Sequence, residues 1–87
     1  MEIQLTKNWA ELENLENNKT YEIQGKFLKN KKVYCVDFLL TQSDIEPAET
    51  STEGFVADTF KVKKISGLNI YVKAITLQTT LNVEEVQ

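Results

Sequence analysis

Short segments in which apolar and polar residues alternate run through the whole chain, and this period of two constrains the fold more than any other feature. Alternation of this kind places successive side chains on opposite faces of an extended strand. Turn residues separate the segments at intervals of about eight to twelve residues, as in small sandwiches and barrels. The sequence therefore predicts an all-β fold, a small antiparallel β-sandwich or barrel of about seven strands. The expected strands span residues 2–6, 20–28, 32–41, 54–58, 59–65, 69–75 and 80–86.

The length predicts a single β domain over residues 1–87, because chains this short rarely divide into two domains. A domain of this size has only a modest core of its own. Yet strands 32–41 and 69–75 both carry apolar residues on both faces. Two explanations are open: such a strand is buried on both faces within the domain, or one face packs against a second protein chain.

The N-terminal region carries a helical signal. Asn8 followed three residues later by Glu11 is a capping pair, and Trp9, Leu12 and Leu15 recur at a spacing of three. This pattern predicts one short N-terminal helical turn. We expect Trp9 to pack this turn onto the sheet.

Three further local features lie within or beside these strands. Gly25 lies inside strand 20–28, where an isolated glycine is typical of a β-bulge. The KNKK segment at 29–32 is expected to form the tip of a hairpin. Cys35 lies in an apolar run, so a buried and unreactive thiol is expected there.

The sequence is poor in groups that catalyse reactions. It contains no His, no Arg, no glycine-rich phosphate loop, and no Ser or Cys beside a base. We therefore expect no enzymatic activity and no cofactor. The formal net charge of −3 argues against a general affinity for nucleic acid, whose phosphates require an excess of Lys and Arg. Because no segment has the length and hydropathy of a signal peptide or membrane span, we expect synthesis in a cytoplasm and no membrane partner.

The segment 42–54 is long, irregular and acidic. Carboxylates are the ligands that Ca²⁺ prefers. A calcium-binding loop, however, places its ligands at short fixed intervals around a central glycine, whereas Gly54 follows the last acid here. We therefore predict no metal site, and a loop that its charge keeps in solvent. The acids in this segment are Asp44, Glu46, Glu49 and Glu53.

The charges are unevenly distributed along the chain. Four of the ten lysines lie between residues 26 and 32, whereas no base lies between residues 42 and 58. Such patches could meet head-to-tail between identical copies, or fix the orientation of docking on another protein. The lysines also alternate with Tyr21, Phe27 and Tyr34, a combination used by barrels that bind single-stranded nucleic acid.

Several pieces of the sequence together carry a resemblance to a known group of proteins. They are Trp9 followed by YEIQG at 21–25, then IEPAETSTEGF at 45–55, and GLNIYVKA at 67–74 followed by LNVEE at 81–85. In this order they resemble the small β-rich virion accessory proteins of tailed bacteriophages, of the head-decoration or tail-adaptor type. The resemblance implies synthesis in the host bacterial cytoplasm and location in the virion. It implies as partners other virion proteins, namely major capsid or tail proteins, and copies of the same chain.

We therefore expect a non-enzymatic structural component of a phage particle, which binds the capsid surface as a decoration or cement protein, or binds the tail, by protein–protein packing. Two alternatives stay open: a small inhibitor or adaptor that binds a host protein through the acidic loop, and a single-strand nucleic-acid-binding barrel. The expected apolar contacts, each of which the pattern would equally place in the core, are Tyr34, Phe38, Leu40, Phe55 and Tyr71. The expected charged contacts are Lys29, Lys31, Lys32, Asp44, Glu46 and Glu49.

Overall fold

The computed structural model describes residues 2–76 and 78–87, and nine strands lie among them. Each of the seven predicted strand segments overlaps at least one of these strands. The strands form two antiparallel sheets, which confirms the predicted all-β sandwich class. Their bounds are β1 Glu2–Gln4, β2 Ala10–Glu11, β3 Thr20–Lys29, β4 Lys32–Cys35, β5 Phe38–Ser43, β6 Phe55–Ala57, β7 Thr59–Lys63, β8 Asn69–Ala74 and β9 Thr80–Val86.

Sheet A is built around β3, the longest strand. One edge of β3 pairs with β9, and β1 pairs with the far edge of β9. The other edge of β3 is shared, because its first half pairs with β7 and its second half with β4. The partner of this edge changes from β7 to β4 at Gly25. The N–H of Gly25 donates to the carbonyl oxygen of Asp58 at 2.8 Å, and its carbonyl oxygen accepts from the N–H of Val36 at 3.1 Å.

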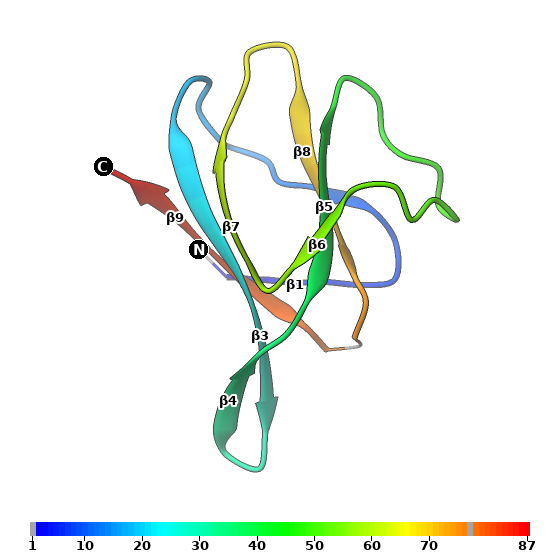
Figure 1. Cartoon of the computed structure of the whole chain (residues 1–87), viewed down its shortest axis with the longest axis vertical. Helices are drawn as coiled ribbons and strands as arrows, with labels where there is room; N and C mark the ends of the chain where they lie inside the picture. Colours follow the sequence, from blue (N-terminus) through cyan, green and yellow to red (C-terminus); the bar gives the residue numbers. More distant parts are fainter. Residues whose placement is uncertain (1, 77) are drawn as a thin grey trace.

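Sheet B has the strand order β2-β8-β5-β6 and packs against sheet A. The two shortest connections between the sheets are residues 36–37, which join β4 to β5, and Asp58, which joins β6 to β7. The predicted strand 32–41 is therefore two strands in different sheets. Figure 1 shows the strands of both sheets in one body, beyond which the hairpin of β3 and β4 projects.

The main core lies between the two sheets and is filled by alternate residues of their central strands. Phe38, Ile23 and Leu81 are among its fully buried side chains. The ring of Phe38 meets the ring of Phe60 edge-on, with 5.2 Å between the ring centroids. Phe60 is partly buried against the core, as the alternation in its strand predicted. The buried members are Leu5, Leu12, Tyr21, Ile23, Phe38, Leu40, Ile70, Val72, Ala74, Leu81 and Val83.

The outer face of sheet B carries a second buried apolar cluster, made of Trp9, Leu39 and Tyr71. The connection between β5 and β6 lies over it, and Trp9 Nε1 donates to the carbonyl oxygen of Ser51 at 3.1 Å. β8 is thus covered by sheet A on one face and by a loop on the other. Of the two explanations for its two apolar faces, burial within the domain is confirmed.

The predicted N-terminal helical turn is wrong. The segment contains β2, which pairs with the edge of β8, and the N–H of Leu12 then donates to the carbonyl oxygen of Ile70 at 2.8 Å. A single helical turn is marginal in water, whereas the edge of β8 offers backbone hydrogen bonds that are already held in place. Trp9 packs on the sheet as predicted, although from an extended segment.

Two other local predictions also fail near the hairpin. Gly25 does not form a bulge, because β3 continues through it. A Cβ atom at Gly25 would lie 2.4 Å from the carbonyl oxygen of Val36, so glycine permits a close approach between strands. Cys35 is exposed rather than buried, because β4 projects beyond sheet B, and its Sγ accepts a hydrogen bond from Gln24 Nε2 at 3.3 Å.

Candidate protein-interaction surface

The hairpin of residues 26–35 projects from the body of the molecule (Figure 1). Its turn consists of two residues, Asn30 and Lys31, with φ values of 53° and 64°. Two left-handed residues are what a type I′ hairpin turn requires, and asparagine adopts this conformation more readily than lysine. The tight turn fixes the register of the strands, in which Leu28 lies opposite Val33.

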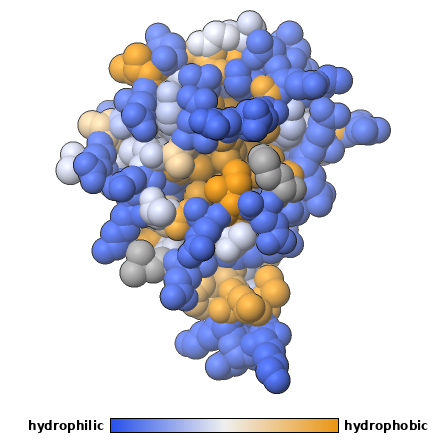
Figure 2. Space-filling view, turned by 180° about the vertical axis from the view of Figure 1, so that it is seen from behind, coloured by the Kyte–Doolittle hydropathy of each residue, from blue (hydrophilic) through white to orange (hydrophobic). Residues whose placement is uncertain are grey.

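Both faces of this hairpin expose apolar side chains. One face carries Leu28 and Val33, which are 67% and 63% exposed. The other carries Phe27 and Tyr34, and Tyr34 is 47% exposed. Figure 2 shows apolar surface on the hairpin directly above its hydrophilic tip. We refer to Leu28, Val33 and Tyr34 as the hairpin patch.

The hairpin patch borders a groove on the outer side of sheet A. Leu28 and Val33 form its apolar wall, and its volume is about 300 Å³. The strands β1 and β9 supply the opposite wall with polar side chains. The other lining residues are Glu2, Lys26, Thr80 and Asn82.

A second exposed apolar area lies at the edge of sheet B. β6 is the last strand of that sheet, and its Phe55 and Val56 are 71% and 56% exposed. The register places Phe55 beside Leu40 and Val56 beside Leu39 on β5, so the two side chains project from opposite faces of the strand. We refer to Phe55 and Val56 as the β6 patch. Ile45, on the loop between β5 and β6, is exposed as well.

The acidic loop of residues 44–54 is held against sheet B through its backbone. Lys73 Nζ donates to the carbonyl oxygen of Glu49 at 2.7 Å and to that of Ser51 at 3.3 Å. The same ammonium group lies 5.8 Å from the centroid of the Trp9 ring. Because the anchoring acceptors are main-chain carbonyl groups, the carboxylates of the loop stay free to face solvent.

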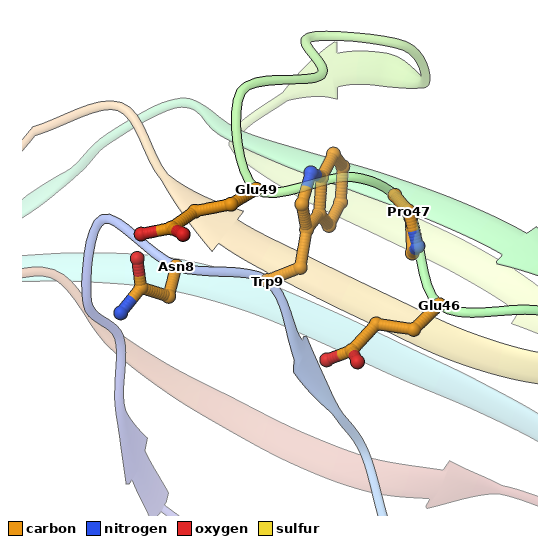
Figure 3. A pocket seen from close by; sticks show the side chains of 5 residues that line it. All are labelled: Asn8, Trp9, Glu46, Pro47 and Glu49. Atoms are coloured by element: carbon orange, nitrogen blue, oxygen red, sulfur yellow. The ribbon is translucent and has the colours of Figure 1, made fainter.

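A shallow pocket of about 240 Å³ forms where the acidic loop meets the N-terminal segment. Figure 3 shows the Trp9 indole standing between the side chains of Glu49 and Pro47, with Asn8 and Glu46 nearby. Trp9 is itself buried, whereas Glu46 and Glu49 are exposed. Two of its five lining side chains are therefore exposed carboxylates, which add a negative rim to this side of the molecule.

The predicted apolar contacts separate into two groups. Tyr34 and Phe55 are exposed and belong to the hairpin patch and the β6 patch. Phe38, Leu40 and Tyr71 are buried inside the domain, so the expectation that they contact another protein is wrong. They lie on β5 and β8, whose two faces are covered by sheet A and by the acidic loop.

The predicted charged contacts all lie at the surface. Those of the hairpin are at its tip, and those of the acidic loop are on a different side of the body (Figure 1). Sequence reasoning missed Leu28, Val33 and Val56, whose alternation is the same as that of core residues. The exposed charged residues are Lys29, Lys31, Lys32, Asp44, Glu46 and Glu49.

The three aromatic residues considered for nucleic-acid stacking do not form one surface. Tyr21 is buried, and its hydroxyl oxygen accepts a hydrogen bond from the N–H of Glu16 at 2.8 Å. Phe27 and Tyr34 pair across the hairpin. Of the three aromatic residues that the nucleic-acid alternative would use, two therefore lie together on the hairpin.

No protein-family model, curated protein or solved structure significantly matches the chain. Within residues 2–76 and 78–87, no three His, Cys, Asp or Glu side chains gather as a metal ion would require. The described part of the chain also contains no helix with the length and apolar character needed to cross a membrane. The function is therefore inferred from the two exposed apolar patches and their charged surroundings.

Proposed function

We propose that this protein is a non-enzymatic structural component of a phage particle, which binds the capsid surface or the tail by protein–protein packing. One observation supports packing as its mode of action: among the described residues, eight large apolar side chains stay exposed although the domain has two buried clusters. Exposed apolar groups gathered on one surface mark interaction sites. The virion as the location is supported by the resemblance between the sequence and small virion accessory proteins.

The β6 patch is the proposed contact with a capsid or tail protein. Full burial of an exposed Phe or Val side chain stabilises a complex by about 1.5–3 kcal/mol, before the loss of translational and rotational freedom is subtracted. The carboxylates of the adjoining acidic loop form a polar rim beside this apolar centre, as in many protein interfaces. Rim charges of one sign favour a basic partner surface and orient the approach.

The proposal is tested on particles of the phage that encodes the chain. Quantitative mass spectrometry of purified particles should detect the protein in a fixed number of copies, and added protein should co-sediment with particles that lack it. The double variant Phe55→Ser and Val56→Ser should reduce co-sedimentation at least tenfold. Ile75→Ser, a matched change at another exposed apolar residue, should leave it unchanged.

Two results would contradict the proposal. One is the absence of the protein from purified particles, and the other is a β6 double variant that co-sediments as well as the unaltered chain. A separate titration with a fluorescent single-stranded oligonucleotide at low salt distinguishes the nucleic-acid alternative. Tight binding that is lost in the variant with Lys29→Glu and Lys32→Glu would show that the hairpin binds single-stranded nucleic acid.

A further inference from the structure

We propose that two copies of this chain associate through the outer edges of their β4 strands, antiparallel and about a two-fold axis at Tyr34. The pairing extends each two-stranded hairpin into a shared four-stranded ribbon of order β3-β4-β4-β3. It uses the hairpin patch and leaves the β6 patch free. This association is a property of the purified protein and does not depend on the proposed function in a particle.

The outer edge of β4 presents a row of backbone hydrogen-bonding groups. No other strand in the described part of the chain pairs with that edge. The bond from Val36 N–H to the carbonyl oxygen of Gly25 fixes which residue pairs exchange hydrogen bonds within the hairpin. Since such pairs alternate along an antiparallel ladder, Tyr34 bonds inward to Phe27, whereas Val33 and Cys35 direct their N–H and C=O groups outward.

The positions of these outward groups favour one register between two copies. In this register Val33 of one copy lies opposite Cys35 of the other, and the two-fold axis places Cys35 of the first copy opposite Val33 of the second. Both residues with outward backbone groups on each strand then form hydrogen bonds. This arrangement allows four backbone hydrogen bonds. A register centred on Val33 or on Cys35 would make only two bonds within regular strand, because the flanking pairs would need the turn or the bend at residues 36–37. The first register therefore satisfies the most groups with regular strand.

The side chains on the two faces of the ribbon support the same partner. Tyr34 lies opposite Tyr34 of the second copy, at a position where cross-strand side chains approach closely. On the other face, the Leu28 and Val33 pairs of the two hairpins come together. Apolar surface that is exposed on both faces of one hairpin becomes continuous over four strands, so each copy covers part of the other's hairpin patch.

The charges at the two ends of the hairpin are complementary in this arrangement. Antiparallel pairing brings the tip of one hairpin beside the base of the other. The tip carries Lys31 and Lys32, and the base carries the exposed Asp37. In the favoured register Lys31 faces Asp37 of the second copy, and the contact occurs twice. Parallel pairing would instead place the lysine tips side by side, where like charges repel each other.

The contact is small, because only four residues of each strand take part. Stable interfaces usually bury more than about 1,000 Å², so this contact alone is expected to be weak in dilute solution. Local concentration in an assembly would strengthen it. The experiment must therefore trap a weak and short-lived dimer.

Disulfide trapping tests the register directly. In a Cys35→Ser background, Tyr34→Cys places two thiols opposite each other across the two-fold axis. Cβ atoms at such a position lie about 4.5–5.5 Å apart, close to the separation that a disulfide accepts. Mild oxidation of the purified protein should give at least tenfold more covalent dimer than Phe55→Cys in the same background, which is the matched control on another exposed edge.

Charge reversal provides a second readout. In the Tyr34→Cys and Cys35→Ser protein, Lys31→Glu should slow dimer trapping at least threefold, and adding Asp37→Lys should restore it, because the exchanged pair is again complementary. Equal trapping at Tyr34 and Phe55 would overturn the proposal. Preferential trapping through the natural Cys35 in the unaltered chain would overturn the register. Trapping at Tyr34 that neither charge change affects would overturn the tip-to-base contact.

Discussion

We expect Gly25→Ala to destabilise this protein strongly, although the same substitution in an ordinary strand usually stabilises a protein. The backbone at Gly25 is that of an ordinary strand, and replacing glycine by alanine at such a position normally stabilises a protein by about 0.4–1 kcal/mol. Here the added Cβ would lie 2.4 Å from the carbonyl oxygen of Val36 and 2.8 Å from Cδ1 of Phe38. Neither contact can be relieved by a flexible surface side chain, since one atom is backbone and the other belongs to a fully buried ring.

The size of the effect follows from two losses. Overpacking a filled core costs about 1–3 kcal/mol. Moving Val36 away also weakens its hydrogen bond to Gly25, which contributes about 1 kcal/mol. After the gain in unfolded-state entropy is subtracted, we expect a net loss of about 2–3 kcal/mol. A domain of this length has a total stability of roughly 4–13 kcal/mol, so the loss is a large fraction of it.

Urea unfolding, followed by far-ultraviolet circular dichroism and by the fluorescence of Trp9, measures this change. Gly67→Ala is the matched control, because Gly67 has a left-handed backbone with φ 87° and no atom within 4 Å of the point where an added methyl group would lie. We expect the control to lose about 1 kcal/mol through backbone strain. Local backbone preferences alone predict the opposite, namely that Gly25→Ala is more stable than Gly67→Ala. If Gly25→Ala is as stable as the unaltered protein, or more stable than Gly67→Ala, the close approach at the strand exchange is refuted.

Three other substitutions test separate contacts. Tyr21→Phe removes the hydroxyl group that accepts the Glu16 N–H, so the free energy of unfolding should fall by about 0.5–1.5 kcal/mol; an unchanged urea midpoint would show that water replaces the bond at no cost. Lys73→Met removes the donor to the carbonyl group of Ser51 but keeps an apolar stem, so cleavage of the acidic loop by a glutamate-specific protease should accelerate several-fold, and an unchanged rate would contradict this anchoring. Lys31→Gly relieves a left-handed lysine and should raise the stability of the monomer by about 0.5–1 kcal/mol in thermal unfolding, whereas a loss would show that the turn is not strained.

The strands were predictable because a single period decides which face of each strand is buried. Phe60 and its neighbours on β7 alternate cleanly, and the structure confirms their inward face. The division of strand 32–41 was not predictable from alternation, since one face continues through Tyr34, Val36, Phe38 and Leu40, and Asp37 interrupts only the other face. The bend depends on Gly25, which lies on another strand and lets Val36 approach closely. A tertiary contact of this kind leaves no periodic signal in the bent segment itself.

The candidate surface was predictable only in part, for a related reason. The alternation identified Tyr34 and Phe38 as apolar residues on one face of the same segment, and one is exposed while the other is fully buried. What separates them is whether an opposing layer extends that far. Sheet A is that layer for Phe38, whereas the acidic loop covers the opposite face of sheet B and is held there by Lys73 and Trp9 through its carbonyl oxygens. Every residue has a carbonyl group, so nothing in the sequence marks this loop as a cover.

The exposed patches lie beside the two shortest connections between the sheets. β4 precedes the crossing at residues 36–37, and β6 precedes the crossing at Asp58. In each case the strand before the crossing is the outermost of its sheet and has no strand beyond it in the described part of the chain. Such a strand has an open edge and incomplete cover, so its apolar side chains meet solvent on both faces. The excess apolar content of the sequence is therefore concentrated at two strand edges, where a partner can add both apolar contact and backbone hydrogen bonds.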